Sequence, residues 1–151
     1  MKLSHVDASG KAVMVDISTK PIVRREATAC GKILLQPETV SRVRQNRIQK
    51  GDVLATARIA AICGAKKTFD LIPLCHNIPI DRIDVGLEIE KDGIAIRATA
   101  AGEAKTGVEM EVLTAVAIAA LTVYDMCKAV DKQMVIGDIR LIRKMKSGIR
   151  R

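Results

Sequence analysis

The side chains with the clearest chemical potential lie at the two ends of one apolar segment. Glu109 and Glu111 precede an uncharged run over residues 112–124, and Asp125 and Lys128 follow it. An acid and a base three residues apart share one helical face, so Asp125 and Lys128 could form a structural ion pair or move protons on a substrate. Partial burial would raise the pKa of Asp125 and lower that of Lys128, which favours the second role.

The apolar run predicts a buried helix over roughly residues 108–129. The uncharged run itself, residues 112–124, is too short to cross a bilayer, for which about 20 residues are needed. From Glu111 to Asp125 a helix rises roughly 21 Å, at about 1.5 Å per residue. One small molecule can hardly contact both ends. If both ends are functional, either there are two subsites or a neighbouring subunit brings its opposite end into the same cleft.

A second candidate is the apolar segment 71–80, in which Pro73 and Pro79 exclude regular structure. Such a loop must be packed, and it presents His76 directly after Cys75. The loop could clamp a ligand through His76, although a lone histidine is about as often simply packed. We expect Cys75 to pack and not to attack a substrate.

Two lysines precede expected helix starts, Lys50 before Gly51 and Lys105 before Thr106-Gly107. Free amides at a helix N-terminus together with an ammonium could receive a phosphate, although neither motif is a Walker loop. Other cations would then suit a polyphosphate, and the alternative for each of them is a solvated surface position. These cations are Arg24, Arg25, Lys144 and Lys146.

The composition points to an anionic partner. Lys and Arg number 25 against 17 Asp and Glu, which gives a net charge of +8. With one Phe, one Tyr and no Trp, the chain offers little for stacking single-stranded bases. A basic nucleic-acid-binding module, in which Lys50, Lys105 and the C-terminal tail grip phosphates, is therefore the alternative to a small-molecule site.

The length of 151 residues predicts one domain, residues 1–151, and the 48% hydrophobic content indicates extra burial between subunits of an oligomer. No signal peptide or transmembrane-length segment is evident, so we expect a cytoplasmic protein without a membrane partner. No metal-ligand or disulfide spacing is present, so thiols are expected at Cys30, Cys63, Cys75 and Cys127.

The expected elements alternate between strands and helices. They are strands at 12–17 and 22–35 with a turn at 19–21, helices from Pro37 and over 53–66, a hairpin of 83–89 with 94–98, the helix 108–129, a last strand around Val135, Ile139 and Leu141, and a basic tail over 143–151. This pattern predicts an α+β, ferredoxin-like fold, in which long helices cover one face of an antiparallel sheet.

Several long motifs resemble the cyclic pyranopterin monophosphate synthase family of molybdenum cofactor biosynthesis. They are Lys50-Gly51-Asp52, Leu71-Ile72-Pro73-Leu74-Cys75-His76, the run from Lys105 to Glu111, and the run from Ala120 to Val130. They occur in the family's order, and the resemblance extends from about Met14 to Ser147.

The resemblance implies a reaction and an assembly. Members convert a cyclised dihydroguanosine triphosphate into cyclic pyranopterin monophosphate and release pyrophosphate. They need no redox cofactor, although a divalent cation could accompany the pyrophosphate, and the sequence offers no dedicated metal-ligand cluster. Members have ferredoxin-like subunits assembled as a homohexamer of three dimers, with sites at the dimer interfaces. No nucleic acid takes part.

The resemblance also implies roles for individual residues. Asp125 corresponds to the family's active-site acid, and Lys50 and Lys128 to the lysines that move protons. The positions expected to bind the pterin-like substrate are Leu74, Cys75, His76, Met110 and Glu111, with Glu109 beside them. Arg25 and Lys144 correspond to basic positions near the phosphates.

Overall fold

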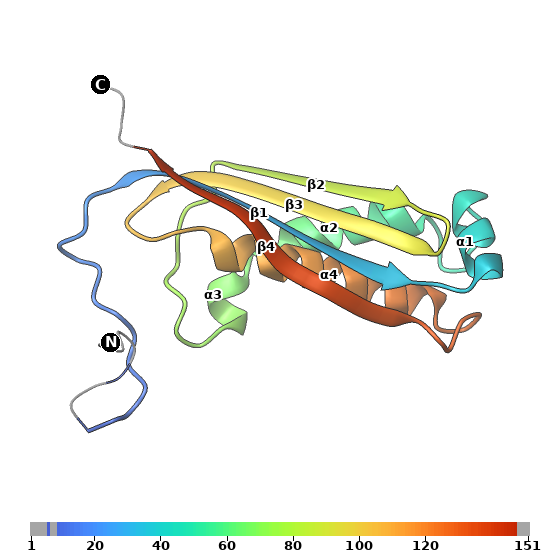
Figure 1. Cartoon of the computed structure of the whole chain (residues 1–151), viewed down its shortest axis with the longest axis horizontal. Helices are drawn as coiled ribbons and strands as arrows, with labels where there is room; N and C mark the ends of the chain where they lie inside the picture. The colour runs from blue at the N-terminus through green and yellow to red at the C-terminus, as the bar shows by residue number, and fades with distance from the viewer. Residues whose placement is uncertain (1–5, 7–8, 148–151) are drawn as a thin grey trace.

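The computed structural model describes residue 6 and residues 9–147. Its antiparallel sheet has the strand order β2-β3-β1-β4. The strands are β1 (Val23–Leu34), β2 (Arg82–Ile89), β3 (Gly93–Ala104) and β4 (Val135–Ser147). The helices are α1 (Pro37–Arg44), α2 (Val53–Lys66), α3 (Thr68–Leu71) and α4 (Glu109–Cys127). Figure 1 shows α2 and α4 side by side on one face of the sheet. The predicted α+β, ferredoxin-like arrangement is confirmed.

The predicted hairpin is confirmed as β2 and β3, which pair antiparallel over their whole shared length. Alternation along each strand gives it one apolar face. Val85 on β2 and Ile96 on β3 belong to the core, whereas the adjacent Asp84 and Arg97 are exposed. The same alternation along β1 turns Ala27, Ala29 and Ile33 into the core. The apolar face of the sheet therefore needs a cover, and the helices supply it.

Helix α4 is the centre of the core. Contrary to the expectation that no segment has transmembrane length, this helix is long and apolar enough to cross a membrane. However, it packs against β1, β3, β4 and α2, as the core helix of a folded domain does. The uncharged middle of the helix is in the core, with Val112, Val116 and Val123 fully buried. Helix α2 buries small residues, namely Ala57, Ala61 and Gly64, and this allows α2 and α4 to approach each other closely. The predicted buried helix is confirmed, with ends one or two residues inside the expected bounds.

The structure corrects the expected strand at residues 12–17. These residues are irregular apart from an isolated bridge between Val6 and Ala12. Their alternating apolar residues suit a strand, but a strand needs a hydrogen-bonding neighbour, and this segment pairs with neither edge strand of the sheet, β2 or β4. The segment instead lies against the loop before β2, where Val15 contacts His76, and the adjoining Ser18 contacts Lys105 in the loop before α4.

The expected basic tail over residues 143–151 is also corrected. Residues 143–147 belong to β4, where Arg143 pairs with Thr28 and Lys146 with Arg25. Main-chain hydrogen bonds to β1 extend the strand whatever its side chains, and polarity alone could not show this. Residues 148–151 lie outside the described residues. The short helix α3 was not expected, because four residues carry too little pattern.

A close approach at Gly31 fixes α4 on the sheet, and this gives a prediction. A Cβ at Gly31 would lie 2.6 Å from Val116 Cγ1, a buried α4 side chain. We expect Gly31→Ala to lower the free energy of unfolding by about 1–3 kcal/mol, because overpacked cores must shift side chains or backbone. Urea denaturation measures this. Gly86→Ala on β2 is the control, since nothing lies within 4 Å of its Cβ position. Equal stability of the two variants would contradict the close-packing account.

Candidate active site

The C-terminal end of α4 carries a carboxylate held between two ammonium groups. Lys128 Nζ lies 2.7 Å from Asp125 Oδ1, and Lys50 Nζ lies 2.6 Å from Asp125 Oδ2. Lys50 Nζ also donates to the Asp125 carbonyl oxygen at 2.9 Å. That carbonyl belongs to the last helical turn, where backbone acceptors lack helical partners. Lys50 therefore satisfies the helix end as well as the carboxylate.

A tight turn between α1 and α2 places Lys50 at this position. Ile48 is buried and anchors the turn in the core, while Gly51 closes it with a hydrogen bond from its N–H to the Ile48 carbonyl. Gly51 has a φ of 105°, which favours glycine. On the far side of the turn, Asp52 caps α2 by accepting from the Ala55 amide. Lys50 thus points at α4. The expected phosphate site at the start of α2 is instead occupied by the Asp52 carboxylate, which accepts from the first turn of that helix.

The electrostatics of this cluster differ from the expectation. The side chains of Asp125 and Lys128 are 55% and 56% exposed, so desolvation has little effect on them. The hydrogen bonds from Lys128 and then Lys50 lower the pKa of Asp125 to about 2. The same contact with Asp125 raises the pKa of Lys128. Both shifts are opposite to those that partial burial would give, and they favour the charged forms of Asp125 and Lys128.

At the other end of α4, a cavity of about 350 Å³ gathers the residues expected to bind the ring of a substrate. We call it the ring cavity. Its walls come from the loop between Pro73 and Pro79, the first turn of α4 and the N-terminal segment over residues 15–20. Six predicted residues line it, namely Leu74, Cys75, His76, Glu109, Met110 and Glu111. The loop is packed as predicted, because Ile78 and Ile80 lie against the core.

Glu111 is the most perturbed group in the ring cavity. It is only 4% exposed, and its Oε2 atom is buried without a hydrogen-bond partner. Burial raises the pKa of Glu111 from 4.5 to about 7, and the charge of Glu109 adds to the shift. An unpartnered buried oxygen is costly, and a ligand N–H group would satisfy it. The site thus holds a carboxyl group that can bind or exchange a proton near neutral pH.

The two other candidates in this loop differ in character. Burial, and then the neighbouring Glu111, raise the pKa of the Cys75 thiol, which keeps it protonated and unreactive. This agrees with the expectation that Cys75 packs. His76 Nε2 lies 2.7 Å from the Val15 carbonyl oxygen. His76 is therefore a polar residue of the cavity wall whose ring is held in place by this contact.

A second cavity, of about 320 Å³, adjoins the first and shares Gly107 and Glu109 with it. We call it the basic cavity. Arg25 and Lys144, the two predicted phosphate-binding residues, both line it, and so does Lys146. Lys144 Nζ lies 3.6 Å from Glu109 Oε1. Arg25 donates to the Lys105 carbonyl at 3.2 Å, which ties it to the loop before α4. Cations thus stand next to the ring cavity.

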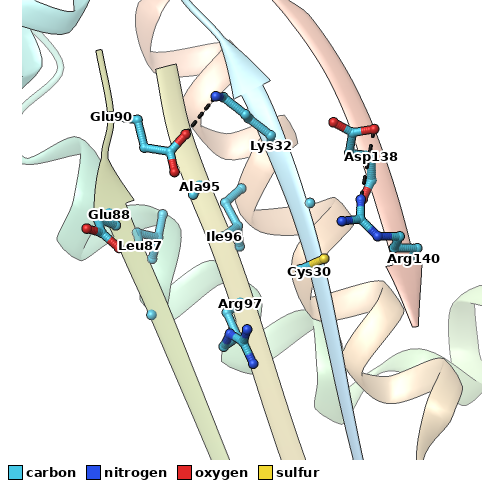
Figure 2. A pocket seen from close by; sticks show the side chains of 12 residues that line it. Cys30, Lys32, Leu87, Glu88, Glu90, Ala95, Ile96, Arg97, Asp138 and Arg140 are labelled. Atoms are coloured by element: carbon cyan, nitrogen blue, oxygen red, sulfur yellow. Dashed lines mark hydrogen bonds and ion pairs between the residues drawn. The ribbon is translucent and has the colours of Figure 1, made fainter. Parts of the chain in front are cut away.

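The structure brings the predicted residues into two groups and not into one. The ring and basic cavities adjoin the first turn of α4, whereas Lys50, Asp125 and Lys128 surround its last turn, roughly 21 Å away at about 1.5 Å per residue. A larger cavity of about 560 Å³ contains none of the predicted residues. It lies on the sheet face opposite the helices, where Figure 2 shows Lys32 directed at Glu90 and Arg140 beside Asp138.

Sequence reasoning missed the residues that the N-terminal segment adds to the ring cavity, namely Val15, Ile17 and Lys20. No local signal could have found them, because their contacts join residues far apart in the chain. Within residues 6 and 9–147, no group of three or more His, Cys, Asp or Glu is arranged to hold a metal ion. The expectation that no cofactor is required stays a prediction.

The burial of Glu111 gives a testable pH dependence. Its pKa is higher in the folded protein than the ordinary 4.5, so between pH 4.5 and about 7 the unfolded chain loses this proton while the folded protein keeps it. Stability therefore falls over that window and stays lower above it. The shift corresponds to up to about 3 kcal/mol. We expect Glu111→Gln to remove this loss, as measured by urea denaturation at pH 5 and pH 8.

The matched control for this prediction is Glu103→Gln, because Glu103 is exposed on β3. It should keep the wild-type difference in stability between the two pH values. If Glu111→Gln shows that same difference, the burial cost assigned to Glu111 is wrong.

Comparison with known proteins places the chain in a family. The model of the MoaC family matches residues 14–147. The cyclic pyranopterin monophosphate synthase of Peptoclostridium acidaminophilum is 51% identical over 144 residues, which cover 95% of this chain and 92% of that protein. The proteins of the same name from Dinoroseobacter shibae and Clostridium perfringens are 54% and 52% identical, over 94% and 97% of this chain and 91% and 96% of their own lengths. The chain belongs to the MoaC family.

Proposed function

We propose that this protein is a cyclic pyranopterin monophosphate synthase, a lyase of molybdenum cofactor biosynthesis. Its substrate would be a cyclised dihydroguanosine triphosphate, and its products cyclic pyranopterin monophosphate and pyrophosphate. The observation that carries the proposal is the pair of adjoining cavities at the start of α4, one with a buried unpartnered carboxyl and one lined with cations. A ring joined to a polyphosphate has the matching shape and charge, and the relatives bear this enzyme's name.

The ring cavity suits a guanine-derived ring because such a ring presents N–H donors along one edge. Glu111 Oε2 is buried without a hydrogen-bond partner from the protein, so an N–H donor placed there would supply a hydrogen bond to a buried acceptor. With a pKa of about 7, Glu111 could also pass a proton to or from the ring as it opens. We therefore propose Glu111 as the group that orients the ring.

The basic cavity suits the phosphates. Arg25, Lys144 and Lys146 line it, and Lys144 makes a loose ion pair of 3.6 Å with Glu109, which a phosphate could replace. Cations there would stabilise the charge that develops when a ribose hydroxyl attacks the innermost phosphorus and its bond to pyrophosphate breaks. A divalent cation that arrives with the triphosphate would add to this charge stabilisation.

Ring opening and pyran closure need proton transfers, for which Asp125, Lys128 and Lys50 are the proposed acid and base groups. In the isolated subunit these groups are exposed and joined by ion pairs, and the contacts lower the pKa of Asp125 to about 2. Covering the cluster with substrate and another subunit would remove water and bring a lysine pKa towards neutrality. We propose that the last turn of α4 from one subunit meets the ring cavity of its neighbour, so that each site uses both subunits.

Exposed apolar side chains near the last turn support contact with a second subunit. Leu121 on α4 is 55% exposed, Val130 just beyond α4 is 47% exposed, and Ile59 on the adjoining α2 is 62% exposed. Such residues become buried in oligomer interfaces. The assembly that we propose is a homohexamer of three dimers, with its sites at dimer interfaces, acting in the cytoplasm.

The proposal predicts turnover of the cyclised dihydroguanosine triphosphate by the purified protein. Lys50→Ala, Lys128→Ala and Asp125→Asn should each lower kcat by about 100-fold or more, because general acid and base groups contribute about 10² to 10⁴. Chromatographic detection of the monophosphate and a pyrophosphate assay measure this. Lys66→Ala, a cation at the end of α2, is the control. If the wild-type protein shows no turnover but binds duplex DNA with a steep salt dependence, the nucleic-acid-binding alternative is correct.

A mixing experiment tests the shared site directly. Glu111→Gln disables the first turn of α4 and Lys128→Ala the last turn. Dimers that contain one copy of each would hold one intact site, so an equimolar mixture that exchanges subunits should regain about a quarter of the wild-type sites. Activity is measured before and after subunit exchange. A site built within one chain would show no recovery, as would a control mixture of Lys128→Ala with Asp125→Asn.

A further inference from the structure

Residues 13–20 cross the ring cavity as an irregular segment, which we call the strap. Three of its side chains, Val15, Ile17 and Lys20, line the cavity. Val13 and Met14 are 42% and 49% exposed, so little apolar burial holds this part of the strap in place. Its position therefore depends strongly on hydrogen bonds to the rest of the protein.

Two side chains from the body of the protein hold the strap by its carbonyl oxygens. Lys105 Nζ donates to the Ser18 carbonyl at 2.6 Å, and His76 Nε2 lies 2.7 Å from the Val15 carbonyl. Within the strap, Asp16 Oδ1 accepts from the Ser18 amide at 2.8 Å, which stiffens the turn between the two anchors. Lys105 and His76 come from the loops before α4 and β2, so the strap joins both sides of the cavity.

The contact at Val15 decides which ring nitrogen of His76 carries a hydrogen. A carbonyl oxygen can only accept a hydrogen bond, so Nε2 must carry a proton in this arrangement. In the neutral ring, Nδ1 is then left as an acceptor. Lys105 holds the same strap three residues further on, at Ser18, so its contact restrains the backbone next to the Val15 carbonyl.

We propose that the strap is the closing wall of the ring cavity and that Lys105 is a positioning residue for it. By holding Ser18, Lys105 keeps Val15 over the cavity and fixes His76 with a protonated Nε2 and an accepting Nδ1 towards an N–H or O–H group of the ligand. Lys105 itself does not line the ring cavity, whereas Thr106 and Gly107 next to it do. For the identity of the ligand, this inference rests on the proposed function.

The first test needs no ligand and compares Lys105→Met with Lys132→Met, a change of another exposed lysine, in the full-length protein. Thermolysin should cleave the strap near Val13 and Met14 about tenfold faster in Lys105→Met, a factor in the range that loss of one charged hydrogen bond gives. Long-range ¹H–¹⁵N spectra should show a fixed Nε2-protonated ring for His76 in the wild type and tautomer averaging in Lys105→Met. A His76→Gln spectrum assigns the signals.

Lys105→Arg provides the rescue, because a guanidinium can also donate to the Ser18 carbonyl; it should restore the wild-type cleavage rate and ring signals. In turnover, Lys105→Met should raise KM about tenfold and lower kcat by no more than about threefold, since a wall and not a reacting group is lost. Unchanged strap cleavage and unchanged His76 signals in Lys105→Met would overturn the inference. That result is independent of turnover, whose absence in the wild type would instead count against the proposed function.

Discussion

The packing of α4 against the sheet is the constraint on which the rest of the structure depends. The middle of this helix is uncharged and buried, and the close approach at Gly31 leaves no room to shift it. Ionisable side chains cannot be accommodated in such a core without a large desolvation cost. They are therefore confined to the two ends of the helix, and the distance between the two groups of candidate residues follows from the length of the apolar run.

The two ends differ in how the protein treats charge. At the first turn, Glu111 is enclosed without a hydrogen-bond partner for one oxygen, and burial raises its pKa to about 7. At the last turn, Asp125 lies in the open between two lysines, and their contacts lower its pKa to about 2. A buried acid that holds its proton near neutrality is prepared for a ligand. An exposed ion triad becomes chemically useful only when something covers it, and this is the physical basis for the proposal that the complete site lies between two subunits.

Loops, and not helices or strands, form most of the ring cavity. Pro73 and Pro79 keep the loop before β2 irregular, so its side chains and carbonyls are free to face a ligand. The loop before α4 contributes Thr106 and Gly107, and the strap adds a third wall. Hydrogen bonds between side chains and main-chain carbonyls join these segments. A fold of this kind supplies a rigid sheet and helix as a platform and leaves recognition to the loops at one end.

The sequence by itself determined the α+β architecture, the hairpin, the bounds of α2 and α4, and the set of candidate residues. It could do so because hydrophobic periodicity and local caps report on burial within one element, and because the motifs resemble a known family. Prediction from the sequence failed for segments whose structure depends on strand pairing or on contacts with residues far away in the chain. Residues 12–17 have a strand-like pattern but pair with neither edge strand of the sheet, whereas the charged residues 143–147 are held in β4 by main-chain hydrogen bonds to β1.

Only the tertiary structure decided the electrostatic state of the candidate site. The sequence suggested partial burial for Asp125 and Lys128, yet the turn that carries Lys50 adds a second ammonium and leaves the cluster in solvent. It also decided that Arg25 and Lys144, far apart in the chain, meet beside Glu109, and that Val15 reaches His76. The spacing of residues along a chain specifies which of them share a helix or strand. Their exposure to solvent and their contacts depend on which other segments pack beside that helix or strand.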